Sequence, residues 1–191
     1  KENCTKHEAI NKAVEILGHK EPNKNERYQQ DLSREQFLGN MYQYFKNAIS
    51  NSKPAKDYLQ SRSLDNKKIE VGYNGGQFHH GARKEETLIN QCLEYGLLID
   101  KGNKGRTGET AYNVFGKWCI VFALKNKENK VVSLYFRSTL NEKESKHFYL
   151  KNRQGLYPNY PKQETKKLIL TEAIIDTATL LQVEQITKEF S

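Results

Sequence analysis

The sequence contains little cysteine. Its 191 residues include three cysteines, Cys4, Cys92 and Cys119, an odd number with no Cys-x-x-Cys spacing. This argues against a disulfide framework and fits the reducing cytoplasm. Cys4 and His7 supply only two of the four ligands of a structural zinc site, and His79–His80 adds no partner at a suitable spacing.

Long apolar runs are also missing. No apolar stretch approaches the roughly 20 residues of a membrane-spanning helix. The N-terminal KENCTKHEAI lacks the apolar region of a signal peptide. The mean hydropathy of −0.86 is that of a polar surface. The sequence therefore predicts a cytoplasmic protein without a membrane partner.

Acidic residues are outnumbered, with 23 Asp and Glu against 31 Lys and Arg, which gives a formal charge of +8. This excess predicts an anionic partner. Nucleic acid is favoured over a membrane surface, because the sequence has no polybasic amphipathic helix. The excess is concentrated between residues 134 and 170, where eight basic residues stand against three acidic ones. The eight are Arg137, Lys143, Lys146, Lys151, Arg153, Lys162, Lys166 and Lys167.

Six aromatic residues interleave with these charges: Tyr135, Phe136, Phe148, Tyr149, Tyr157 and Tyr160. Cations that neutralise phosphates, beside rings on which bases stack, are the components of a single-strand binding groove. Arg137 is the sharpest candidate, because it follows the alternating segment 131–136 and is projected from a strand. The alternative is a solvated surface of basic side chains over an aromatic core.

Periodicity predicts helices in the first part of the chain and strands after it. The helices are expected at 7–17, from about Ser33 to 49, from Pro54 to about Arg62, and at 84–95, with a polar linker at 19–33 after the first. The segment 100–110, DKGNKGRTGET, is predicted to be a flexible basic loop. Strands are expected at 118–124, 131–138 and 147–150.

The segment 168–181 predicts a strand–turn–helix unit. A short apolar strand, Leu168 to Leu170, leads through Thr171 and Glu172 into a helix from 173 to 181. Ligands gather at the carboxyl ends of strands in open α/β sheets. On a helix, Glu172 and Asp176 would share a face, and two carboxylates can hold a divalent cation such as Mg²⁺. The alternative is that Glu172 only places negative charge at a helix start. The expected class is therefore α+β, with the beginning of an α/β unit at the end.

Several motifs, in order, resemble bacterial DnaG-type DNA primases. The run 58–64, YLQSRSL, followed by IEVGY at 69–73, is similar to the family's "YLxxRGL … I … F.IGY" segment. Residues 112–124 resemble "YD.F..RI.FPI", residues 131–137 resemble "G.vi.F.GR", and residues 146–150 resemble "KYLNS". Residues 151–157 resemble "KG..LYG", and the segment around Glu172 resembles "vEGy.Dv.aL", the first Toprim motif.

The resemblance implies a primase-core fold and assigns roles to residues. A helical N-terminal part (1–32) would precede an antiparallel β meander with helices that binds DNA (33–164), and 165–191 would begin a Toprim domain. Arg62, Arg137, Lys146, Lys151 and Arg153 would line the groove for a single-stranded DNA template. Glu172, with Asp176 in support, would help to hold the Mg²⁺ or Mn²⁺ of a nucleotidyltransferase. Nucleoside triphosphates and a replicative helicase are the further partners that the resemblance implies.

The chain also departs from the family pattern. Ser63 and Ala173 stand where the family has glycine, and residues 133–136 lack the paired glycines before the arginine. Neither the later DxD motif nor the zinc module that precedes the core is present. We therefore expect a fragment that binds template without polymerising. A non-catalytic replication adaptor on the same fold is the main alternative. Another Toprim nuclease or topoisomerase is disfavoured by the upstream motifs, and acyl-transfer and redox enzymes lack their motifs.

Overall fold

A computed structural model describes residues 32–81, 85–105, 108–140 and 146–190. The predicted helix at 7–17 and residues 19–31 of the predicted linker, with Cys4 and His7, lie outside the described residues. The fold is mixed, with helices and antiparallel sheet, as predicted. No helix in the described ranges combines the length and apolarity needed to cross a bilayer.

The main sheet has four antiparallel strands in the order β1-β4-β5-β6. Their bounds are Gly72–Asn74 for β1, Cys119–Lys125 for β4, Val131–Ser138 for β5 and His147–Tyr149 for β6. The two central strands are almost entirely buried, as their apolar and aromatic composition predicts. The predicted strands at 118–124, 131–138 and 147–150 are confirmed to within one residue.

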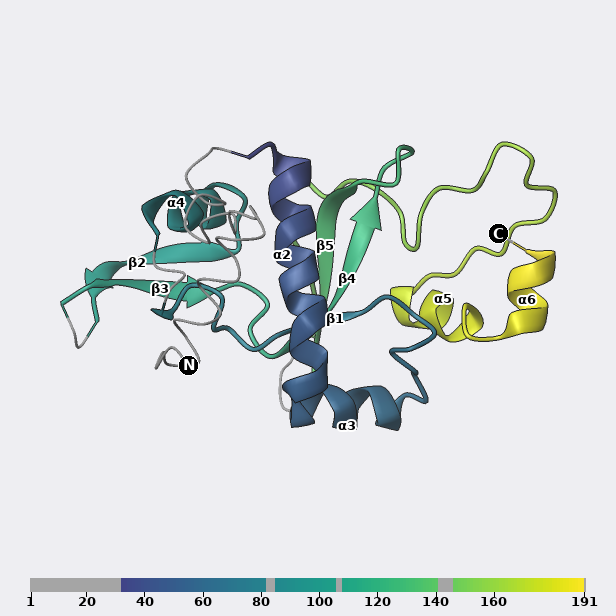
Figure 1. The fold of residues 1–191 in the computed structure, drawn as a ribbon, viewed down its shortest axis with the longest axis horizontal. Coiled ribbons are helices and arrows are strands. Elements are labelled where there is room, and N and C mark those ends of the chain that lie inside the picture. The colour runs from purple at the N-terminus through teal and green to yellow at the C-terminus, as the bar shows by residue number, and fades with distance from the viewer. Residues whose placement is uncertain (1–31, 82–84, 106–107, 141–145, 191) are drawn as a thin grey trace, which may run out of the picture. The chain divides into compact units, whose positions relative to one another are not determined.

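The long helix α2, Arg34–Ala48, covers one face of this sheet (Figure 1). Ser33 begins it with a capping box, in which the Gln36 amide donates to Ser33 Oγ (3.4 Å) and the Ser33 amide donates to Gln36 Oε1 (3.2 Å). Gly72 allows the helix to approach β1 closely, because a Cβ there would lie 2.8 Å from Phe45 Cβ. Phe37, Leu38, Met41 and Phe45 of the helix are buried.

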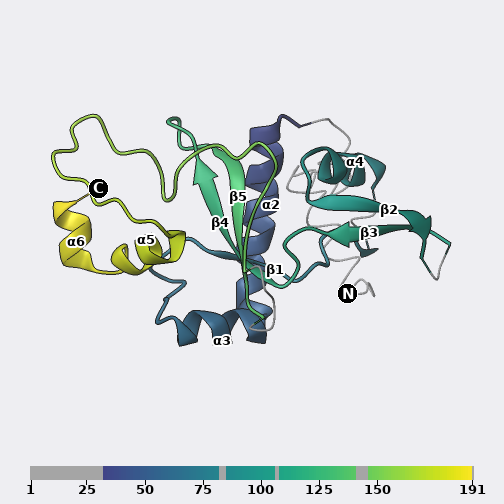
Figure 2. The same cartoon turned by 180° about the vertical axis from the view of Figure 1, so that it is seen from behind.

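The other face carries the core that positions the candidate site. Tyr73, Ile120, Phe122, Leu124 and Tyr135 project from this face into one buried cluster. Ala55 and Leu59 of α3 (Lys53–Ser61) and Ala178 of α5 (Ile174–Leu180) complete the cluster. A 3₁₀ turn, η2 (Ile49–Asn51), joins α2 to α3. The helices α3 and α5 therefore lie on the sheet face opposite α2 (Figure 2).

The turn after α3 is tied to the segment after α5. Gln182 donates from Nε2 to the Ser63 carbonyl (3.1 Å) and accepts at Oε1 from the Asp65 amide (2.5 Å). Ser63 has a φ of 53°, a left-handed conformation that favours glycine. It stands where the resembled motif has glycine.

The prediction of a flexible basic loop at 100–110 is wrong for about half of this segment. Residues Leu98–Lys104 form β2, which pairs with β3 (Thr110–Val114) in a separate antiparallel sheet beside α4 (Glu86–Glu94). All the side chains of β2 after Leu98 are exposed, so the strand has no alternating apolar pattern that could reveal it. Backbone pairing with β3, with an irregularity between Asp100 and Lys104, holds it in place.

The predicted strand at Leu168 to Leu170 is also wrong. These residues have no regular structure, and Leu170 is 84% exposed. A strand requires a neighbour for its backbone groups, and none of the strands in the described ranges pairs with this segment. The helix that follows is confirmed as α5, and a further helix, α6 (Glu184–Glu189), was not predicted.

Candidate nucleic-acid interface

Arg137 is fixed on the sheet face that carries α3 and α5. It is the second-last residue of β5 and lies opposite His147, in the last pair of the β5–β6 ladder. Its Nε donates to the Tyr58 hydroxyl of α3 at 3.0 Å, and its Nη1 contacts His147 Nε2. These contacts use two of the five N–H donors of a guanidinium, so the group is oriented while further donors remain for an anion.

His147 joins Arg137 to the aromatic residues of the sheet. Its Nδ1 lies 2.5 Å from the Tyr135 hydroxyl. Burial, and then the adjacent Arg137 charge, lower the pKa of His147 below its usual value. The neutral ring accepts from Arg137 at Nε2, which leaves the proton on Nδ1 to be donated to Tyr135. Burial raises the pKa of the Tyr135 hydroxyl, which therefore stays protonated.

Two further arginines stack on tyrosines at either end of this network. Arg62, at the C-terminal cap of α3, has its Cζ 5.8 Å from the centroid of the Tyr58 ring. Arg153 has its Cζ 3.9 Å from the Tyr149 ring, and that ring lies 5.0 Å from the Tyr135 ring. We refer to the connected set as the arginine–tyrosine row. Its members, in order, are Arg62, Tyr58, Arg137, His147, Tyr135, Tyr149 and Arg153.

The row combines guanidinium groups with flat rings, of which those of Tyr58 and Tyr149 are partly exposed and that of Tyr135 is buried. A guanidinium is a bidentate donor suited to phosphate oxygens. Tyrosine rings provide faces on which unpaired bases can stack. Arg62 and Arg153 are exposed, whereas Arg137 is half-buried and held on both sides. The arrangement is chemically suited to a flexible, single-stranded polyanion.

The two predicted lysines are placed differently. The Lys146 carbonyl accepts from the Ser138 amide just before β6 begins. Lys151 is exposed, and its carbonyl accepts from Arg34 Nη2 at the start of α2 (3.2 Å). The structure therefore brings Arg62, Arg137 and Arg153 together in one network of contacts, whereas the two lysines are held through their backbone.

Glu172 and Asp176 do not share a helix face. Glu172 lies in a bend before the cap residue Ala173, and Asp176 lies in the first turn of α5. Both are exposed, and the described part of the chain contains no group of three or more His, Cys, Asp or Glu placed to hold a metal. Two exposed carboxylates supply too few oxygen ligands for a complete divalent-cation site. The described residues therefore do not fit a complete Mg²⁺ or Mn²⁺ site.

Tyr58 and His147 belong to the row, but no role was predicted for either. Cross-strand register is the signal that could have found His147, whereas Tyr58 reaches Arg137 from the helix α3. The pairing of Arg137 with His147 follows from the β5–β6 ladder, and the loop between these strands contains residues 139–146. Loop length alone does not fix this register, so the contact requires the structure.

The fold is similar to that of DNA primase catalytic cores. It superposes on the Aquifex aeolicus primase (zinc-binding and RNA polymerase domains) with a TM-score of 0.54 and 19% identity, covering 78% of this chain and 36% of that one. The E. coli primase catalytic core gives a TM-score of 0.49 at 13% identity, and the match covers 65% of this chain and 40% of that one. A DnaG primase catalytic domain bound to single-stranded DNA gives a TM-score of 0.48 at 14% identity, and the match covers 63% of this chain and 39% of that one.

These similarities concern the fold. No protein-family model matches the sequence, and no curated protein sequence matches it. The chain spans between 36% and 40% of the lengths of these three structures. The similarity therefore supports the class of fold predicted from the motifs, while activity and substrates depend on the chemistry of the site.

Proposed function

We propose that this chain contains the template-binding part of a DNA primase catalytic core, the part that holds single-stranded DNA during RNA primer synthesis. The observation that carries the proposal is the arginine–tyrosine row. Three guanidinium groups and three tyrosine rings form one network of contacts, in a fold similar to that of the Aquifex aeolicus primase.

The row would bind the template through its phosphates and bases. Arg62, Arg137 and Arg153 would each neutralise a phosphate, and the partly exposed rings of Tyr58 and Tyr149 would accept unpaired bases. Lys146 and Lys151 would add long-range attraction. Glu172 lies close in sequence to Ile174, which packs against the same core cluster as Tyr135. We propose that Glu172, with Asp176 in support, contributes one side of a metal site whose other ligands come from elsewhere in the complete enzyme.

A salt titration of single-stranded DNA binding tests the proposal. For single strands, the slope of log affinity against log salt is about −0.7 per neutralised phosphate, so three arginines give about −2. A fourfold rise in salt, from about 50 to 200 mM, should therefore weaken binding about 20-fold from a micromolar dissociation constant. The measurement is fluorescence anisotropy of a labelled oligonucleotide. Absent or salt-independent binding would refute the proposal.

Primer synthesis distinguishes an enzyme from an adaptor. In the complete protein, with nucleoside triphosphates and Mg²⁺, we expect RNA synthesis on single-stranded DNA that Glu172→Gln abolishes without weakening template binding. Template binding without synthesis by the unaltered complete protein would instead identify a non-catalytic replication adaptor. The chain alone should bind template and synthesise nothing.

A further inference from the structure

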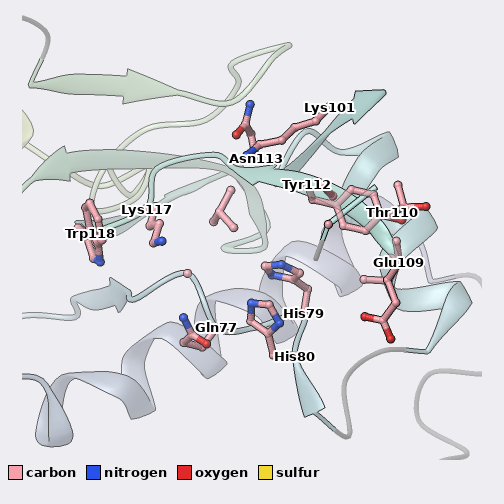
Figure 3. Close-up of a pocket in the computed structure, with 15 residues that line it drawn as sticks. Gln77, His79, His80, Lys101, Glu109, Thr110, Tyr112, Asn113, Lys117 and Trp118 are labelled. Carbon is pink, nitrogen blue, oxygen red and sulfur yellow. The ribbon is translucent and has the colours of Figure 1, made fainter. Parts of the chain in front are cut away.

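A second candidate site is a cavity that lies away from the arginine–tyrosine row and shares no residue with it. We refer to it as the second cavity. It has a volume of about 760 Å³ and opens between the loop that follows β1 and the strands β2 and β3 (Figure 3). This volume is within the range of about 300–1,000 Å³ that is typical of small-molecule sites. Its lining residues come from the loop after β1, from α4, from β2 with the turn that follows it, and from the stretch that contains β3 and Trp118; Figure 3 shows His79, Tyr112 and Trp118 among them.

The backbone around the cavity is held by Asn74, which is fully buried. Its side chain donates to the Phe115 carbonyl (2.9 Å) and accepts from the Gly76 amide (2.9 Å), and its carbonyl accepts from the Trp118 amide (2.7 Å). One side chain thus ties the loop after β1 to the turn between β3 and β4. Trp118 has a φ of 60°, a left-handed conformation that is strained for a bulky residue and that clusters at binding sites.

Aromatic rings line the cavity. The His79 and His80 rings lie side by side with centroids 4.0 Å apart, and the Tyr112 ring meets His79 edge-on at 6.2 Å. Trp118 is 43% exposed, which is unusual for the largest apolar side chain. Flat, partly exposed rings from different segments offer stacking surfaces to a planar ligand.

His79 adds a hydrogen-bonding group that lacks a partner. The residue is only 9% exposed, and its Nδ1 is buried without a hydrogen-bond partner in the described part of the chain. Burial, and then the neighbouring His80 and Lys117, lower the pKa of His79 to about 4. The imidazole is therefore neutral at pH 7. A neutral ring can exchange hydrogen bonds with the edge of a bound heterocycle, and a buried polar atom without a partner is otherwise costly.

The charged side chains that line the cavity are Lys101, Lys117 and Glu109, so cations predominate. Lys117 Nζ lies 4.5 Å from the centroid of the Trp118 ring. A planar base could replace the ammonium on that ring, and the flexible lysine could then reach a phosphate attached to the base. No cluster of metal-binding side chains occurs among the described residues, so the two histidines are not accounted for by a metal.

We propose that this cavity binds one nucleotide unit, with its base stacked on Trp118 and hydrogen-bonded to His79 and its phosphate near Lys117. The unit could be a free mononucleotide or one nucleotide of a single strand, and both share this chemistry. This function goes beyond template binding by the row, because it uses different residues on a different part of the fold.

Trp118 is the only tryptophan of the chain, so its fluorescence reports directly on stacking. The full chain is titrated with adenosine monophosphate, with a short oligothymidylate and with ribose 5-phosphate, which has no base. We expect saturable quenching by at least one of the first two and none by ribose 5-phosphate. Quenching by the mononucleotide identifies a free-nucleotide site, and quenching by the oligonucleotide alone identifies a strand site.

Two variants that retain Trp118 test the pocket itself. Lys117→Ala should weaken binding of the quenching ligand about tenfold, and His79→Gln should weaken it severalfold. Lys56→Ala, at an exposed position on α3, is the matched control and should leave the affinity unchanged. Circular dichroism confirms that each variant is folded. Absence of saturable quenching by both nucleotide ligands, or equal quenching by ribose 5-phosphate, would overturn the proposal. Arg137→Gln should leave mononucleotide quenching unchanged, which separates this test from the test of the row.

Discussion

Replacing Gly116 by alanine should destabilise the fold strongly, because two independent costs meet at this position. Gly116 has a φ of 62°, and a Cβ there would lie 2.3 Å from Cδ1 of Phe136, a ring that is 0% exposed. The left-handed conformation costs an L-residue about 1–2 kcal/mol. Displacing a buried ring costs about 1–3 kcal/mol more. The total of about 2–5 kcal/mol is a large share of a typical domain stability of about 5–15 kcal/mol.

Gly102→Ala is the matched control. Gly102 has a φ of 68°, but nothing lies within 4 Å of the position that its Cβ would take. Only the conformational cost of about 1–2 kcal/mol applies there. Urea denaturation followed by circular dichroism should therefore show Gly116→Ala to be the more destabilising by about 1–3 kcal/mol. Equal losses in the two variants would refute the close packing of β5 against the turn before β4.

Three further predictions concern other parts of the fold. Between pH 6.5 and about 4 the unfolded chain protonates His79 while the folded chain does not, so the free energy of unfolding decreases as the pH falls, by up to about 3 kcal/mol. The His79→Gln variant should lose this part of the pH dependence when urea denaturation at pH 7 is compared with pH 4.5. An unchanged pH dependence in the variant would contradict this prediction. Ser63→Gly should raise the free energy of unfolding by about 1 kcal/mol in the same assay, because φ is 53° there; a loss of stability would contradict it. Hydrogen bonding to Lys46, reinforced by Lys125, lowers the pKa of Glu70. This carboxylate therefore stabilises the fold at pH values above its ordinary pKa, and the stabilisation is lost as the pH falls through the lowered pKa. The Glu70→Gln variant should show a smaller decrease of melting temperature with falling pH than the unaltered chain, and an identical decrease would contradict this prediction.

The elements with strong local signals were predicted well from the sequence. The strand 131–138 combines β-branched and aromatic residues, and its observed bounds are the predicted ones. Ser33 was correctly placed at the start of a helix. The ordered motifs likewise predicted a fold that the similarity to the Aquifex aeolicus primase supports.

The rest depended on contacts that a local pattern does not encode. The polar strand β2 exists because β3 pairs with it, whereas the apolar segment at Leu168 has no partner strand among the described residues and stays irregular. The position of Arg137 was predicted, but its partners Tyr58 and His147 depend on register and on the packing of α3. The cavity around Trp118 joins segments that are about 40 residues apart, and the isolated histidines gave no indication of it.

A comparison of charge-neutralised variants separates the row from general positive charge. The test variant carries Arg→Gln changes at Arg62, Arg137 and Arg153. The control carries Lys→Gln changes at three exposed lysines outside the row and outside the second cavity. These are Lys67, Lys104 and Lys127. Both variants lose three positive charges, so they differ only in where the charge was removed.

The salt dependence of single-stranded DNA binding by these two variants tests the central claim most directly. If the row contacts three phosphates, the arginine variant should lose about 2 from the slope of log affinity against log salt, because each contact contributes about 0.7. The lysine variant should keep the slope of the unaltered chain. Equal slopes in the two variants would show that binding depends on net charge alone and would contradict a template site at the arginine–tyrosine row.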